Sequence, residues 1–130
     1  MNEKEGFFVN VYLLVGIGGF IGAMLRYGIS VMTEMWWYGS FPAATLFANY
    51  AGCFLLPYVS CKMGSFVPTN VQKAITSGII GSFTTFSAFS VETIALFESG
   101  KIAVGLLYLS LSITGGLLFV RLGEGRGNSK

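Results

Sequence analysis

The sequence predicts an all-α integral membrane protein with four transmembrane helices, the third of which is broken near its middle. Two features of the 130-residue chain favour this fold class. Hydrophobic residues make up 53% of the chain and charged residues only 11%, whereas soluble domains usually have about 25% charged residues. The charged residues are also separated by long uncharged runs, which are 6–25, 35–61, 74–91 and 102–120. Each run approaches, reaches or exceeds the roughly 20 apolar residues that a helix needs to cross the hydrocarbon core.

These runs predict one transmembrane domain over residues 1–122. Allowing for short connections, we expect helices at 8–32, 41–61, 69–97 and 102–122. The first helix is too long for the apolar region of a signal peptide, and no small-residue cleavage site follows it. Residues 123–130 are polar and Gly-rich, which predicts a flexible C-terminal tail.

The composition also excludes several classes of function. The chain has no His and only two Cys, which excludes most transition-metal sites and all His-based acid–base catalysis. We expect Cys53 and Cys61 to be small buried apolar residues. The phosphate-binding loop of ATP-driven transporters is missing, and no nucleophile–base pair suggests an enzyme.

The first helix contains one cation, Arg26, inside the span or at its edge. Gly18 and Gly22 precede it at i,i+4 spacing, so another helix can approach closely there. Arg26 either snorkels to the lipid headgroups or stays inside as a buried cation. A buried cation would order a neighbouring loop or attract an anion into a vestibule.

The second helix has two polar residues, Thr45 and Asn49, which share one face because they are four apart. An amide in mid-membrane needs a partner. Asn49 therefore makes a hydrogen bond to another helix or donates into a pore. Pro57 removes a backbone donor and predicts a kink in this helix.

The third helix is the most informative segment. Gly, Ser and Thr are concentrated over residues 78–85, so we expect the helix to break near 81–85, where the backbone would be buried or line a cavity. Carbonyl groups freed by the break could bind a cation. Phe86, Phe89 and either Glu92 or Thr93 follow at i,i+3 spacing on one stripe. Such a stripe is typical of core packing, although an acid within a span favours a functional role.

The fourth helix presents Tyr108 and Ser112 at i,i+4 spacing. Hydroxyl groups in membrane helices often bond back to their own helix, but these two could also form a polar track opposite the Phe stripe. Amide, hydroxyl and guanidinium donors together with ring edges suit a small anion, because a ring edge is the positive end of the quadrupole. A cation path would more often show rings of acids or carbonyl filters.

At this point the sequence resembles the CrcB/Fluc family of fluoride channels over nearly its whole length. Residues 18–27 read GGFIGAMLRY and resemble the helix-1 motif of that family. Residues 44–49 read ATLFAN and resemble its GTLxVN motif. Residues 81–92 read GSFTTFSAFSVE and resemble its specific GGxTTFSTFSxE motif.

The resemblance implies an antiparallel, dual-topology dimer with two narrow pores for dehydrated fluoride. The residues that it assigns to the fluoride pathway are Phe86 and Phe89 through their ring edges, Asn49 through its amide, Thr45, Tyr108, Ser112, Glu92 and Arg26. It also implies that the backbone carbonyls of Gly81 and Thr84 hold a structural Na⁺ at the dimer centre. The implied function is passive export of fluoride, which enters cells as HF and is trapped as the ion in the less acidic cytoplasm.

Several positions depart from the family pattern. Gly is replaced by Ala44 in the helix-2 motif and by Ser82 in the helix-3 motif, where it could alter the Na⁺ site. Ala88 stands where the motif has Thr between the two Phe, and Pro57 stands where a Gly is usual. A third helix-4 hydroxyl would fall at Gly116, so we expect a shorter polar track.

The Lys and Arg residues are distributed unevenly between the two ends of the predicted bundle. The end with both termini holds Lys4, Lys62, Lys73, Arg121, Arg126 and Lys130. The other end holds Lys101, so the positive-inside rule predicts cytoplasmic termini. A dual-topology homodimer needs a weaker bias. The partner is therefore a second copy or, as a hypothesis, an oppositely oriented paralogue.

Two other functions remain as alternatives. A four-helix multidrug/proton antiporter would need an acidic residue within the first helix, and residues 6–25 contain none. A non-transporting membrane assembly subunit would leave Asn49, the broken helix and Glu92 without a purpose.

Overall fold

The computed structural model describes residues 3–64 and 66–128, and it is helical almost throughout. The elements in chain order are α1 (Glu3–Trp36), α2 (Ala43–Met63), α3 (Thr69–Lys73), the π-helix η1 (Ala74–Ile80), α4 (Gly81–Phe83), α5 (Phe86–Glu98) and α6 (Ile102–Gly127). Four segments are long and apolar enough to cross a membrane: Asn10–Trp36, Ala43–Met63, Thr69–Glu98 and Ile102–Gly127. The all-α membrane fold with four transmembrane helices is therefore confirmed.

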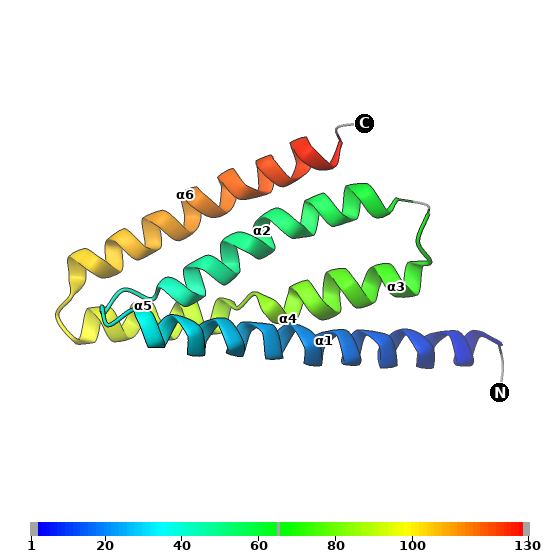
Figure 1. Ribbon diagram of the computed structural model, residues 1–130, viewed down its shortest axis with the longest axis horizontal. Helices are drawn as coiled ribbons and strands as arrows, with labels where there is room; N and C mark the ends of the chain where they lie inside the picture. Colours follow the sequence, from blue (N-terminus) through cyan, green and yellow to red (C-terminus); the bar gives the residue numbers. More distant parts are fainter. Residues whose placement is uncertain (1–2, 65, 129–130) are drawn as a thin grey trace.

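The four spans form two packed pairs. Figure 1 shows α6 lying along α2, and α1 lying along the third span, which consists of α3, η1, α4 and α5. The start of α1 and the end of α6 lie at the same end of the molecule, as an even number of spans requires.

Small residues let α1 approach the third span closely. A Cβ atom added to Gly78 of η1 would lie 2.8 Å from the carbonyl oxygen of Val15. A Cβ atom on Gly22 would overlap the backbone of Ile79. The two backbones therefore touch, which is how membrane helices pack when apolar burial gives no net driving force in lipid.

The third span breaks at Thr84 and Thr85. Both residues have extended backbone angles, with ψ of 156° at Thr84 and φ of −150° at Thr85. The Thr85 hydroxyl then caps α5 by accepting from the Ala88 backbone N–H at 3.2 Å. This confirms the predicted break, and it follows a π-helical segment, η1, that the sequence did not predict.

Some boundaries differ from those expected. Helix α1 continues past residue 32 to Trp36, and α2 passes through Pro57 without interruption. Helix α6 continues past residue 122 to Gly127, so residues 123–127 are helical rather than a flexible tail; residues 129–130 lie outside the described residues.

Packing explains the longer last helix. A Cβ atom on Gly123 would meet Pro57, and one on Gly127 would lie 2.6 Å from Cys61 Cβ. The glycines thus hold the end of α6 against α2. Both cysteines are free; Cys53 is half-buried but Cys61 is exposed, so the expectation of two buried thiols is wrong for Cys61.

Candidate functional site: the broken helix and the cavity beside it

Asn49 ties α2 to the break in the third span. Its Nδ2 donates to the Thr85 carbonyl oxygen at 3.1 Å, and its Oδ1 accepts from the Thr85 backbone N–H at 2.8 Å. One amide thus satisfies both backbone groups that the break removes from the helix. The second amide hydrogen of Asn49 has no partner in the described part of the chain.

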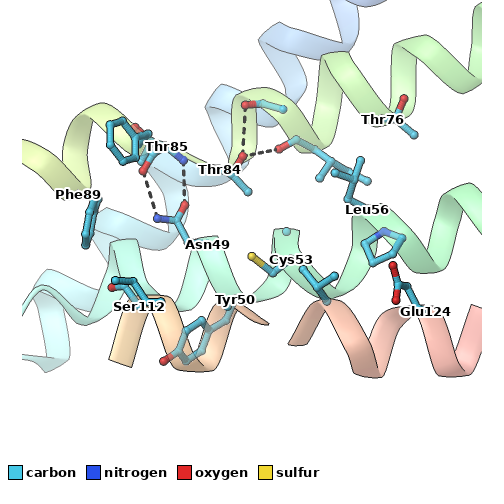
Figure 2. Close-up of a pocket in the computed structure, with 18 residues that line it drawn as sticks. Asn49, Tyr50, Cys53, Leu56, Thr76, Thr84, Thr85, Phe89, Ser112 and Glu124 are labelled. Atoms are coloured by element: carbon cyan, nitrogen blue, oxygen red, sulfur yellow. Dashed lines mark hydrogen bonds between the residues drawn. The ribbon is translucent and has the colours of Figure 1, made fainter. Parts of the chain in front are cut away.

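A cavity of about 690 Å³ opens beside this contact, between α2, the third span and α6. Figure 2 shows Asn49, Thr85, Phe89 and Ser112 grouped at one end of it. Asn49, Phe86, Phe89 and Ser112 all line the cavity. The structure therefore brings together an amide, two aromatic rings and a hydroxyl group from three different spans.

The two phenylalanine rings lie on consecutive turns of α5. Their centroids are 5.8 Å apart with an interplanar angle of 41°. Phe86 is 79% exposed, which is unusual for a large ring unless lipid or another subunit covers it. Phe89 is half-buried, with its centroid 5.3 Å from that of Tyr108.

A second cluster forms around Glu92. Thr45 Oγ1 donates to one carboxyl oxygen at 2.7 Å, and the Tyr108 hydroxyl donates to the other at 2.7 Å. Tyr108 is fully buried and makes an edge contact with Phe41. Its hydroxyl is therefore committed to Glu92, and the structure does not bring Tyr108 and Ser112 onto one cavity wall.

Arg26 lies on the other side of the break. A smaller cavity of about 250 Å³ is lined by Arg26, Thr45, Thr85 and Glu92. Arg26 is half-buried and has no ion pair within residues 3–64 and 66–128. Because Thr85 lines both cavities, the break separates the side with Arg26 and Glu92 from the side with the phenylalanines.

The short helix α4 and the residue after it border the larger cavity. Gly81 and Thr84 both line it, and helix ends leave carbonyls without intrahelical partners. The Gly81 carbonyl accepts a long hydrogen bond of 3.4 Å from Thr84 Oγ1. Ser82 points elsewhere, since a Cβ on Gly19 of α1 would lie 3.2 Å from its hydroxyl oxygen. Carbonyl oxygens are ligands that an alkali cation accepts, and the Ser82 hydroxyl lies toward α1.

Comparison with known proteins identifies the family. The family model described as "CrcB-like protein, Camphor Resistance (CrcB)" matches residues 13–124, which include most of every span. The chain belongs to the CrcB-like family.

CrcB-like relatives with assigned names share substantial identity with this chain. The "Fluoride-specific ion channel FluC 1" of Bacillus thuringiensis subsp. konkukian is 44% identical over 115 residues, covering 87% of this chain and 84% of the relative. The "Fluoride-specific ion channel FluC 2" of Geobacillus kaustophilus is 43% identical over 110 residues, covering 83% and 85%. The "Fluoride-specific ion channel FluC" of Clostridium perfringens is 41% identical over 114 residues, covering 86% and 89%.

Two residues of this CrcB-like chain contribute contacts that sequence reasoning missed. Thr85 joins Asn49 and caps α5; a Thr directly before an apolar helical run was an available N-cap signal in the sequence. Tyr50 donates from its hydroxyl to the Leu111 carbonyl oxygen at 2.5 Å. No periodicity rule predicts that contact, because it depends on the rotation of α6.

Proposed function

We propose that this CrcB-like protein is a passive fluoride-selective channel that exports cytoplasmic fluoride. The names of its relatives support fluoride as the transported ion. Four apolar helices support a multi-pass membrane location. The observation with the most weight is that Asn49, Phe86, Phe89 and Ser112 line one cavity beside a broken transmembrane helix.

These groups suit a dehydrated anion. Fluoride loses strong hydration when it enters a narrow path, so the wall must return hydrogen bonds or positive electrostatic potential. The second Asn49 amide hydrogen and the Ser112 hydroxyl are donors. The edges of Phe86 and Phe89 are positive and apolar, so they favour an anion without binding water strongly.

The other part of the proposed pathway consists of Thr45, Tyr108, Glu92 and Arg26. The two hydroxyl groups hold the Glu92 carboxylate, which faces the same cavity as Arg26. Arg26 would draw anions to this side of the break. Glu92 would limit how strongly they bind, since conduction requires an ion to leave as well as to enter.

We further propose an antiparallel dimer with a structural Na⁺ at its centre. The carbonyl oxygens of Gly81 and Thr84 would hold the ion, which would neutralise carbonyl dipoles that the break leaves unpaired. A second subunit would cover the exposed Phe86 ring. That subunit is either another copy or an oppositely oriented paralogue.

Fluoride efflux from liposomes, followed with a fluoride electrode, tests this function. A channel predicts efflux that needs only a charge-compensating ionophore, whereas a drug/proton antiporter or an assembly subunit predicts none. Phe86→Ile and Phe89→Ile should each abolish efflux while the protein still elutes as an assembled species, because aliphatic side chains lack a positive edge. Unchanged efflux in both variants would rule out the ring-edge mechanism.

A further inference from the structure

Two tryptophans and a tyrosine follow one another where the first span ends. The span Asn10–Trp36 finishes at Trp36, and Trp37 and Tyr38 begin the loop to α2. Trp36 is 84% exposed, Trp37 50% and Tyr38 92%. Figure 1 shows this loop at the end of the molecule opposite the start of α1 and the end of α6. We call Trp36, Trp37 and Tyr38 the aromatic end surface.

The loop holds these rings through specific contacts. The Trp37 backbone N–H donates to the Thr33 carbonyl oxygen at 2.8 Å, which extends the last turn of α1 into the loop. The Trp37 ring folds over Gly39, where a Cβ atom would lie 2.9 Å from the indole nitrogen. Lys101, in the turn between α5 and α6, donates to Ser40 Oγ. The exposed rings are therefore presented by a loop that is tied to both neighbouring parts of the bundle.

Each of the three rings has a polar hydrogen without a partner. Within residues 3–64 and 66–128, neither indole N–H nor the Tyr38 hydroxyl forms a hydrogen bond. In the hydrocarbon core these donors would stay unsatisfied, and in water the rings would form a large exposed apolar patch. A side chain with an apolar body and a polar tip suits the boundary between the two.

The distribution of charge indicates which partner this end needs. Basic side chains gather at the opposite end, namely Lys62, Lys73, Arg121 and Arg126, where they can hold the protein to lipid headgroups. In the two connections at the aromatic end, 37–42 and 99–101, the sequence has a single basic residue, Lys101. Aromatic side chains can hold such an end to the bilayer without charge.

We propose that the aromatic end surface docks in the headgroup region of the bilayer, with its three polar hydrogens bonded to lipid phosphate and ester oxygens. Trp and Tyr side chains prefer this depth, and such anchors help to set the tilt of a span. The loop continues to Phe41, whose ring makes an edge contact with Tyr108 at 5.6 Å, so the anchor also holds the segment that covers Tyr108. The inference does not depend on which ion is transported.

Fluorescence quenching in vesicles tests the inference on the whole chain, because Trp36 and Trp37 are its only tryptophans. The protein is reconstituted into phosphatidylcholine vesicles whose acyl chains carry bromine either near the ester groups or near the chain ends. Iodide is added separately as a quencher in water. Bromine near the ester groups should quench more strongly than bromine near the chain ends, and iodide should quench weakly. The emission should lie at shorter wavelength than that of tryptophan in water.

Single-tryptophan variants separate the two rings. Trp36→Phe and Trp37→Phe each leave one reporter, and both should keep the shallow profile. A deep reference is Leu117→Trp in the Trp36→Phe/Trp37→Phe background, because Leu117 is exposed near the middle of α6. Bromine near the chain ends should quench that reporter the most.

Three results would overturn the inference. Quenching by iodide alone would place the rings in water, and no quenching by bromine or iodide would place them against another protein chain. A wild-type profile like that of the Leu117→Trp reference would place them in the hydrocarbon core. Each result leaves the proposed channel function intact, since no fluoride flux is measured. Absence of fluoride efflux would instead overturn the channel function and leave the expected quenching profile unchanged.

Discussion

Asn49 replaces two backbone partners with one side chain at the point where the third span breaks. Its amide pairs with both the N–H and the carbonyl group of Thr85. In the hydrocarbon core of a membrane no water is available to form hydrogen bonds with these backbone groups instead. The same residue lines the cavity with Phe86 and Phe89, so one side chain supports the break and shapes the proposed path.

Asn49→Ala should therefore lower stability more than an ordinary polar-to-Ala change. It leaves two backbone groups unsatisfied, each at a cost of about 1 to 3 kcal/mol. The measurement is thermal loss of the monodisperse species in detergent. Asn70→Ala is the matched control, because Asn70 Oδ1 is buried without a hydrogen-bond partner within the described chain. Equal losses in both variants would argue against a special role for Asn49.

For individual residues, the sequence predicted part of the candidate site. The pattern around residues 81–92 singled out Phe86, Phe89 and Glu92, and the structure brings the two rings to the same cavity as Asn49 and Ser112. The i,i+4 spacing of Tyr108 and Ser112 could not reveal that the Tyr108 hydroxyl bonds to Glu92. That outcome depends on how far α5 and α6 rotate against each other.

The third span shows what can be predicted for a whole element. Its concentration of Gly, Ser and Thr predicted the break, since such residues make a poor continuous helix and can satisfy freed backbone groups. The π-helix η1 before the break has no comparable signal in the sequence, because its register results from packing against α1. Side-chain spacing alone therefore misplaces residues within 74–80.

Glycines of α1 allow a direct test of this packing. Gly22→Ala should reduce the yield of folded protein, because the new methyl group would overlap the Ile79 backbone. Gly16→Ala is the control, since a Cβ there meets nothing within 4 Å. Size-exclusion yield and thermal stability provide the comparison. If the two variants behave alike, the close approach of α1 and η1 is not needed for folding.

Tyr50 fixes α6 against α2. Its hydroxyl bonds to the Leu111 carbonyl, its ring stacks on Phe119 with centroids 4.9 Å apart, and Gly115 leaves room for the ring. Leu111 directly precedes Ser112, so this contact fixes the position of Ser112 on the cavity wall.

Tyr50→Phe should accordingly reduce fluoride efflux by about two- to tenfold, corresponding to one hydrogen bond of about 0.5 to 1.5 kcal/mol. Tyr58→Phe removes a hydroxyl group from the same helix. That hydroxyl has no hydrogen-bond partner within the described chain, so the substitution should leave efflux unchanged. A loss of equal size in Tyr58→Phe would indicate a general effect of removing hydroxyl groups.

For the whole molecule, the positions of the charges were sufficient to predict four spans, because charged residues are excluded from the hydrocarbon core. The same charges predict orientation. Lys62, Lys73, Arg121 and Arg126 belong to helix ends or turns at the end where α6 finishes, whereas Lys101 lies at the opposite end and donates to Ser40.

A chain with this bias, expressed alone, should insert with its termini in the cytoplasm. A C-terminal tag should then resist protease added to intact cells and be removed after permeabilisation. Lys62→Glu and Lys73→Glu together reduce the positive charge at this end of the bundle. A fraction of the tags should then become accessible to protease in intact cells. Equal exposure of wild-type tags on both sides would show dual topology and would favour a homodimer over pairing with a paralogue.

The most direct test of the central claim is ion release from liposomes that contain only this chain and are loaded with both fluoride and chloride. Chains reconstituted from detergent insert in either orientation, so antiparallel pairs can form. We predict fluoride release that begins when valinomycin is added to compensate charge, while chloride stays inside. Retention of fluoride, or release of both anions at similar rates, would contradict a passive fluoride-selective channel.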